Sequence, residues 1–218
     1  MKTKREVHKM ICNSMRLCMD PTFNQEGFTR ELNSIEYVRK VEGGSQYVCI
    51  FSENRPRYEP LALARLYPQI RFRFPELNRI AFEMVGGKIE LIGGCDWTFS
   101  QPIDLVIPKQ HHTCWFIYNE KSVDSCLQSL MMSLETWIFP FLSEYSSIES
   151  LTAAYAKKDP RYVWSRPLCI FVTAALIHSG ELNKASEVLE TKFGRPGVRK
   201  QYAMAFDYVS NLKSSGEY

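Results

Sequence analysis

The feature that most constrains the fold is a single change of hydrophobic period about halfway along the chain. Between residues 35 and 118, short segments alternate apolar and polar side chains or form compact apolar runs, as strands do. From about residue 119 onward, apolar residues recur at helical spacing. Strands that follow one another and then give way to helices indicate an α+β fold. We predict an N-terminal helix, an antiparallel sheet of about five or six strands and a C-terminal helical bundle.

The clearest strand is predicted at residues 69–74. There Ile70 and Phe72 alternate with Arg71 and Arg73, which is typical of a half-buried antiparallel strand. A Gly-Gly link also predicts a hairpin between two strands further upstream. The other strand candidates are short apolar or alternating runs at residues 35–41, 46–51, 88–92, 103–107 and 114–118.

Proline and glycine set the bounds of the predicted helices. The N-terminal helix is expected over residues 3–19, and a short helix is expected to start at Pro75 and end at Gly86. The C-terminal half is expected to hold five helices: residues 121–137, kinked or ended by Pro140; a helix to residue 157, with a capping box at Ser146 and Glu149; residues 167–178; residues 182–193; and a last helix from Pro196.

Nothing in the sequence separates the two halves. No low-complexity linker lies between them. We therefore predict one cooperative unit over residues 1–218, with a helix-plus-sheet subregion at residues 1–118 and a helical subregion at residues 119–218.

The seven cysteines favour a reducing compartment. They are odd in number, none forms a Cys-x-x-Cys pair, and most lie between apolar neighbours. Disulfide frameworks and structural zinc sites use paired cysteines. We therefore predict buried, reduced thiols and a cytoplasmic protein.

No apolar segment has the length of a membrane span. The most apolar run, residues 168–177, has about half of the roughly 20 residues that a membrane helix needs. The basic first residues are not followed by the uninterrupted apolar stretch of an export signal. We predict a soluble protein that does not bind membranes.

The short motifs of common enzyme classes are missing. The sequence contains no Gly-x-Gly-x-x-Gly, no Walker phosphate loop, no His-Glu-x-x-His and no Gly-x-Ser-x-Gly. We predict no catalytic residue, no metal and no cofactor. A protein without enzymatic activity is favoured, although the sequence leaves an activity open.

An arginine-rich segment is the main candidate for a binding surface. Residues 55–79 contain six arginines and two glutamates, whereas the net charge of the whole chain is only +3. Arginine forks beside aromatic rings can bind a phosphate, a single-stranded nucleic acid or an acidic protein, and the low net charge favours the protein. Alternatively, these arginines are solvated or pair with Glu36, Glu53 or Glu59. The predicted partner-binding residues are Arg55, Arg57, Tyr58, Arg71 and Arg73.

A second candidate site lies after the sheet segment. Adjacent histidines on a strand point to opposite faces, so a shared metal ion is not predicted for them there. The residues could instead contribute to a small-molecule pocket between the sheet and the helical bundle. The residues of this alternative pocket are His111, His112, Cys114 and Trp115.

Several features together resemble a group of uncharacterised bacterial domains that includes immunity-type proteins. The resembling parts are the leading helix, Gly27–Phe28 before the first strands, the sheet, and the Trp-Ile-Phe-Pro-Phe-Leu run at residues 137–142. The resemblance covers about residues 3–145, and the helices after Asp159 depart from it. It implies a stoichiometric binding protein without chemistry of its own, and it carries over no functional residues.

The sequence therefore supports two hypotheses about function. The first is a non-enzymatic cytoplasmic interaction protein, of the immunity or regulatory type, whose arginine-rich surface binds an acidic protein partner. The alternative is a small-molecule-binding protein or an enzyme with a pocket between sheet and bundle. Nucleic-acid binding ranks last. The sequence does not indicate the identity of the partner or the oligomeric state.

Overall fold

The computed structural model describes residues 2–215, which divide into two compact units. The first unit comprises residues 2–41, 45–71 and 100–144, and the second comprises residues 42–44, 72–99 and 145–215. Residues 119–144, the first part of the predicted helical subregion, belong to the first unit. The prediction that residues 1–218 form one cooperative unit concerns how the chain unfolds, and it stays a prediction.

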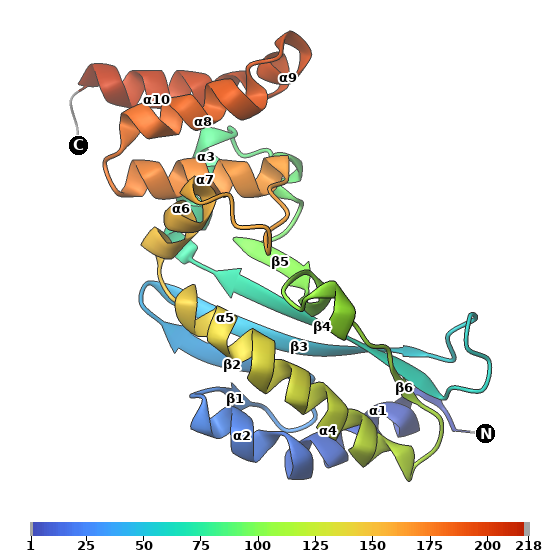
Figure 1. The fold of residues 1–218 in the computed structure, drawn as a ribbon. Helices are drawn as coiled ribbons and strands as arrows, with labels where there is room; N and C mark the ends of the chain where they lie inside the picture. Colours follow the sequence, from blue (N-terminus) through green and yellow to red (C-terminus); the bar gives the residue numbers. More distant parts are fainter. Residues whose placement is uncertain (1, 216–218) are drawn as a thin grey trace. The chain divides into compact units, whose positions relative to one another are not determined.

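The strands of residues 2–215 form one six-stranded antiparallel sheet, which confirms the α+β fold (Figure 1). The sheet follows the path β1-β2-β3-β4-β5, and β6 also pairs with β4. Because a strand has two edges, β3 occupies one edge of β4, and β5 and β6 share the other. The strands are β1 (Thr29–Arg30), β2 (Glu36–Val41), β3 (Gly44–Asn54), β4 (Ala64–Arg73), β5 (Phe99–Pro102) and β6 (Trp115–Ile117).

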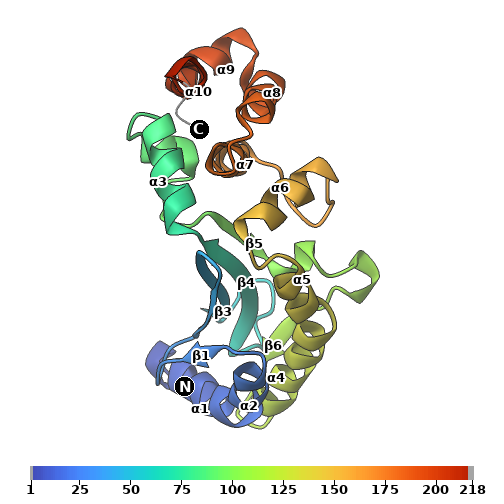
Figure 2. The ribbon, with the colours of Figure 1, turned by 90° about the vertical axis from the view of Figure 1, so that its left-hand side faces the viewer.

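In the first unit, helices pack against one face of the sheet (Figure 2). Tyr37 of β2 points to this face, where its buried ring stacks on Phe23 at a centroid distance of 3.6 Å. Gln46 of β3 donates a hydrogen bond to the carbonyl of Leu142 at 2.6 Å. The covered face is therefore the core of this unit. Its helices are α1 (Lys4–Cys18), α2 (Asp20–Gln25), α4 (Ser122–Ser133), the π-helical turn η4 (Leu134–Ile138) and α5 (Phe139–Glu144).

The N-terminal helix is confirmed, and a short helix that the sequence pattern did not predict follows it. Thr3 is the N-cap of α1, and its hydroxyl and Glu6 form a capping box. Helix α2 begins directly after α1, and Pro21 lies in its first turn. A proline is tolerated there because the first N–H groups of a helix have no partner within the helix.

Pro140 does not end the helical segment, so the alternative in which this proline ends the predicted helix is wrong. The helix widens into the π turn η4 just before it, and the N–H of Phe139 bonds to the carbonyl of Leu134, five residues back. This wider turn accommodates a residue that lacks an N–H donor. The helical segment then continues as α5.

The second unit consists of helices around α7. Residues 168–177 of α7 are all buried, which accounts for the most apolar run of the sequence. Within residues 2–215, no helix has both the length and the apolar character needed to cross a lipid bilayer. The helices are α3 (Pro75–Met84), the 3-10 turn η1 (Ile89–Ile92), α6 (Ile148–Ala156), α7 (Arg166–His178), α8 (Leu182–Phe193), α9 (Pro196–Gln201) and α10 (Ala203–Ser215).

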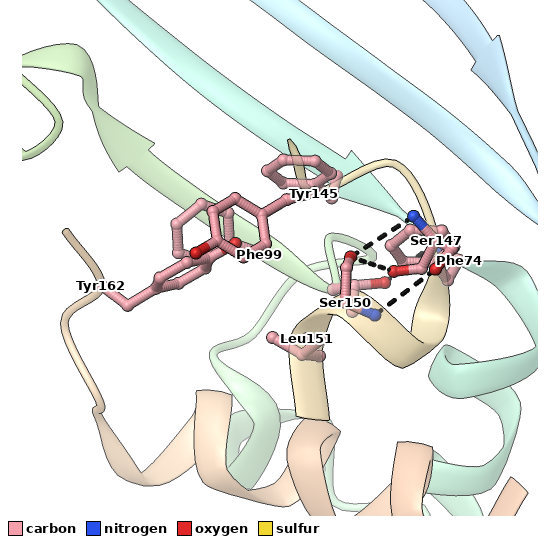
Figure 3. A pocket seen from close by; sticks show the side chains of 9 residues that line it. Phe74, Phe99, Tyr145, Ser147, Ser150, Leu151 and Tyr162 are labelled. Atoms are coloured by element: carbon pink, nitrogen blue, oxygen red, sulfur yellow. Dashed lines mark hydrogen bonds between the residues drawn. The ribbon is translucent and has the colours of Figure 1, made fainter. Parts of the chain in front are cut away.

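Two details of the predicted helices are corrected. The N-cap of α6 is Ser147, whose hydroxyl accepts a hydrogen bond from the N–H of Ser150 at 3.4 Å, while the hydroxyl of Ser150 accepts one from the N–H of Ser147 (Figure 3). The capping box therefore uses Ser147 and Ser150 instead of Ser146 and Glu149. The last helix is also interrupted, since α9 ends at Gln201 and α10 begins at Ala203.

Two predicted strands are helical turns. Residues 88–92 contain η1, which ends at Gly93 with a φ of 96°. Residues 103–107 begin with the 3-10 turn η2 (Ile103–Leu105). A short apolar run fits either a buried strand or a buried helical turn, so its period did not separate the two. The pattern also missed β5 and the two-residue strand β1.

The cysteines differ in their access to solvent, which gives a first testable prediction. Cys114 is exposed, while Cys12, Cys49, Cys126 and Cys169 are buried. Burial raises the pKa of the Cys49 thiol to about 12 and that of Cys126 to about 11. Since the thiolate is the nucleophile, we expect iodoacetamide to label Cys114 first in the native protein.

The four buried thiols are expected to react only after unfolding. Peptide mass spectrometry after a brief pulse of the reagent measures the order of labelling. Denatured protein, in which all seven cysteines react, is the control. Early labelling of Cys49 or Cys126 would contradict the burial described here.

Candidate functional site

The face of the sheet opposite the helices carries the polar side of β4. Ala64, Leu66, Pro68 and Ile70 are buried, and the residues that alternate with them are partly or fully exposed. This arrangement confirms the alternation predicted for residues 69–74 and extends it toward the start of the strand. The predicted arginine surface is therefore expected on this open face.

Two of the predicted binding arginines have their charges balanced within their own units. In the first unit, Arg71 donates from Nη1 to Oε1 of Glu36 at 3.4 Å, its guanidinium lies 4.8 Å from the centre of the Phe51 ring, and its side chain is 17% exposed. Arg73 belongs to the second unit and forms an ion pair with Asp96. Pairing of Arg71 with Glu36 is one of the alternatives that the sequence left open.

The other three predicted binding residues lie together on the loop between β3 and β4. Arg55, Arg57 and Tyr58 are all exposed. Arg55 donates to the backbone carbonyl of Lys2 at 3.0 Å. Within residues 2–215, Arg57 has no hydrogen bond or ion pair. The structure thus brings these three together in the first unit, whereas Arg73 belongs to the second.

Strands β4 and β6 add further aromatic and basic side chains beside this loop. The Tyr58 hydroxyl accepts a hydrogen bond from Nη1 of Arg65 at 2.8 Å and donates one to Glu53 at 2.8 Å. The ring of Phe116 lies 6.3 Å from that of Tyr58 and 6.2 Å from that of Tyr118. We name this cluster the aromatic–arginine surface; its residues are Arg55, Arg57, Tyr58, Arg65, Phe116 and Tyr118.

Arg65, Phe116 and Tyr118 were not among the predicted site residues. Arg65 lies directly opposite Phe116 in the register of β4 and β6, so the two side chains share a face. The alternation of β4 reaches back past Pro68 to Ala64, and reading it that far would have placed Arg65 and Arg71 on one face. The pairing of β4 with β6 is a long-range contact that no local pattern encodes.

The four residues of the alternative pocket do not form one cluster. His111 is exposed at the end of the 3-10 turn η3 (Lys109–His111), and its ring lies 5.4 Å from that of Trp137. His112 is exposed and bonds through Nε2 to the carbonyl of Ile107 at 2.8 Å. Cys114 is exposed, and Trp115 is buried in β6. Trp115 lines a cavity.

This cavity, which we name the notch cavity, has a volume of about 160 Å³ and lies in the first unit. Its wall consists of the middle of β4, the segment after β5 and the start of β6. The hydrogen bond to Tyr58 raises the pKa of Arg65, with smaller contributions from Cys114 and Asp104. The lining residues are Arg65, Leu66, Tyr67, Pro68, Gln69, Pro102, Asp104, Thr113 and Trp115.

Two hollows of the second unit are weaker candidates for a ligand site. One void between Phe99, Tyr145 and Tyr162 has a volume of about 10 Å³, which is room for one water molecule (Figure 3). The other is a groove of about 370 Å³ beside α3. The charged groups of its wall are already paired, for example Arg73 with Asp96. Neither hollow offers polar groups that await a ligand.

No metal centre or relative identifies the function. Among residues 2–215, no three histidine, cysteine, aspartate or glutamate side chains are arranged to hold a metal ion. No family model, no curated protein and no solved structure matches the chain. The function therefore has to be inferred from the side chains of the surface and of the notch cavity.

Proposed function

We propose that this protein is a non-enzymatic interaction factor that binds an acidic protein partner through the aromatic–arginine surface. The observation that carries the proposal is how three guanidinium groups are bonded. Arg55 bonds to a backbone carbonyl, Arg65 bonds to a tyrosine hydroxyl, and Arg57 has no bond to the described residues. None of the three pairs with a carboxylate of residues 2–215, so their charges are available to a partner.

The composition of the surface favours a protein as the partner. Tyrosine and arginine are enriched among the residues that dominate the binding energy of protein interfaces. Tyr58 is 57% exposed and Tyr118 is 44% exposed, and Leu61, on the same loop, is 80% exposed. An apolar centre with a basic rim fits a partner whose own apolar centre has an acidic rim.

Nucleic acid is a poorer match to the same surface. An exposed sheet face with aromatic rings can stack bases, but carboxylates share this face. Glu53 accepts the hydrogen bond of the Tyr58 hydroxyl, and Glu36 pairs with Arg71 further along the sheet. Carboxylates next to the rings repel phosphates, whereas a protein partner can place its own donors against them. The net charge of +3 adds little long-range attraction for a polyanion.

The proposal includes an immunity or regulatory role in the cytoplasm, as the sequence suggested. Such a role needs a stoichiometric complex and no chemical step. It also predicts that substitutions on the surface weaken binding without unfolding the protein, because the side chains of Arg57 and Tyr58 are exposed.

Site-specific photo-crosslinking in living cells tests the proposal. A benzophenone amino acid placed at position 58 or 118 is expected to form one adduct of defined mass. Placed at Leu17 or Met132, which are 71% and 69% exposed on the helical side of the same unit, it is expected to form none. The control positions match the surface in exposure, so they separate a specific partner from random collisions.

The mass of the adduct and its disappearance on charge reversal decide the outcome. Arg57→Glu in the chain that carries the crosslinker at position 118 is expected to reduce the yield of the adduct at least about tenfold, since a repulsive charge replaces an attractive one. Equal adducts at positions 17 and 58 would contradict the proposal. An adduct with nucleic acid instead of protein would also contradict it.

A further inference from the structure

Three buried polar atoms of residues that line the notch cavity have no hydrogen-bond partner within residues 2–215. They are Nε of Arg65, Oδ1 of Asp104 and Nε1 of Trp115, and all three residues line the same cavity. Trp115 is 4% exposed, so its indole N–H is shielded from bulk solvent. A buried donor or acceptor without a partner destabilises the fold, and proteins seldom gather several of them at one place without a function.

The charges on the cavity wall are complementary but not paired with each other. Arg65 donates from Nη1 to the Tyr58 hydroxyl at 2.8 Å. Within residues 2–215, Asp104 has no hydrogen bond and forms no ion pair. The guanidinium of Arg65 and the carboxylate of Asp104 therefore line one cavity without forming an ion pair with each other. A molecule that carries both charges satisfies both groups at once.

The polarity of each group indicates how a ligand would be oriented. Arg65 and Trp115 present N–H donors, so they suit an acceptor with negative charge. Asp104 presents a carboxylate oxygen, so it suits a cationic donor. Leu66 and Pro68, which also line the cavity, are buried apolar residues that fit a short aliphatic group.

The size of the cavity limits the ligand. Its volume of about 160 Å³ is close to that of an engineered protein cavity of about 150 Å³ that binds benzene. The ligand is therefore expected to contain roughly six to eight non-hydrogen atoms. A nucleotide or a peptide is too large to be enclosed, whereas an amino acid with a short side chain fits.

We propose that the notch cavity binds a small zwitterion, an α-amino acid with a short side chain. On binding, the cavity side chains turn toward the ligand, so that its carboxylate accepts hydrogen bonds from Nε of Arg65 and Nε1 of Trp115, and its ammonium group donates to Oδ1 of Asp104. This proposal does not depend on the partner-binding role proposed above, although the two sites share one residue. The two meet at Arg65, which contacts Tyr58 on one side and lines the cavity on the other.

Nuclear magnetic resonance of the full chain labelled with ¹⁵N tests this site directly. The protein has four tryptophans, and Trp115→Phe identifies the indole signal of Trp115. Glycine, L-alanine and L-serine are the probes. We expect each to shift the Trp115 indole signal along a saturating curve, because a new acceptor reaches Nε1, while the indole signals of Trp137 and Trp164 stay in place.

Two analogues with one charge each serve as matched ligands. N-acetylglycine keeps the carboxylate and lacks the ammonium group, and glycinamide keeps the ammonium group and lacks the carboxylate. Each is expected to bind at least about tenfold more weakly than glycine, since a charged hydrogen bond contributes about 1.5–3 kcal/mol. Equal affinity for glycine and N-acetylglycine would overturn the assignment of a zwitterion.

The isosteric variant Asp104→Asn tests the role of the carboxylate. It removes a charge that is partly exposed and has no partner within residues 2–215, so the fold is expected to persist. The variant should bind glycine at least about tenfold more weakly and bind N-acetylglycine as the wild type does. A Trp115 signal that no zwitterion shifts, so that the cavity holds only water, would overturn the proposal. Crosslinking of a protein at position 58 is unaffected by that outcome.

Discussion

Replacing Arg30 with alanine is expected to lower the free energy of unfolding by about 3–5 kcal/mol. Arg30 belongs to β1, and its side chain is 3% exposed. It donates from Nε and Nη2 to the two carboxylate oxygens of Asp20, both at 2.9 Å, and from Nη1 to the carbonyl of Ser34 at 2.9 Å. The guanidinium therefore joins α2, β1 and the segment before β2.

The loss is large because the Arg30 side chain is buried and its partner Asp20 is only 25% exposed. Tyr37 also donates to Asp20, at 2.6 Å, and the burial of Tyr37 together with this carboxylate raises the pKa of the tyrosine. Without Arg30, Asp20 keeps a negative charge beside a hydroxyl and little else to balance it. Removing one member of a buried pair in this way costs more than the pair gained when it formed.

Urea denaturation followed by circular dichroism measures this effect, with Arg5→Ala as the control. Arg5 is exposed on α1 of the same unit, so its removal is expected to change the free energy of unfolding by less than about 0.5 kcal/mol. A loss below about 1 kcal/mol for Arg30→Ala would mean that the pair is solvated and contributes as surface pairs do.

Asp159→Ala is expected to destabilise the second unit by about 2–3 kcal/mol. Asp159 is 7% exposed and accepts hydrogen bonds from the Tyr145 hydroxyl and from Nη2 of Arg161, the latter at 2.7 Å. The backbone N–H of Arg161 also donates to it at 2.9 Å. Alanine leaves these donors without their common acceptor. Lys184→Ala, at an exposed pair on α8, is the control and is expected to have little effect.

The contribution of Asp159 is also expected to depend on pH. Burial opposes ionisation, but the hydrogen bonds from Arg161 and Tyr145 hold the pKa of Asp159 below its usual value. Its contribution is therefore complete above the pKa of the unfolded chain, about 3.9, and is lost as the pH falls through the lower value of the folded state. The difference between wild type and Asp159→Ala should narrow as the pH falls below about 3.9. A constant difference would contradict the pairing.

The two variants together test whether the chain unfolds as one unit. Arg30 belongs to the first unit and Asp159 to the second. If residues 1–218 are one cooperative unit, as the sequence suggested, each variant shifts a single transition seen by every probe. Two transitions, each moved by one variant, would replace that prediction with two independently stable units.

Local patterns predicted the parts of the fold whose causes are local. The alternation of Ile70 and Arg71 predicted the pleat of β4, and Pro75 and Gly86 predicted the bounds of α3. The apolar run of residues 168–177 predicted the buried helix α7. In each case the side-chain period or a backbone restriction acts within a few residues. Short runs such as residues 88–92 failed because three apolar residues fit a turn as well as a strand.

The candidate sites depend on contacts that no local pattern contains. Arg71 and Arg73 look equivalent in the sequence, yet Glu36 balances one and Asp96 balances the other, from distant segments. Trp115 was selected beside two histidines, whereas its neighbours in the notch cavity are Arg65 and Asp104. The pairing of β4 with β6 brings Arg65 and Trp115 together, and the turn η2 adds Asp104 to the same cavity.

The affinity of the purified protein for the partner found by crosslinking tests the central claim most directly. Calorimetry would compare the wild type with Tyr58→Ala, Arg57→Glu and Arg73→Glu. The account predicts a loss of at least about 30-fold for Tyr58→Ala, which corresponds to about 2 kcal/mol, and a loss for Arg57→Glu that shrinks in high salt. It predicts a change of less than about twofold for Arg73→Glu, because Asp96 already balances that charge. Unchanged affinity for Tyr58→Ala, or an equal loss for Arg73→Glu, would contradict it.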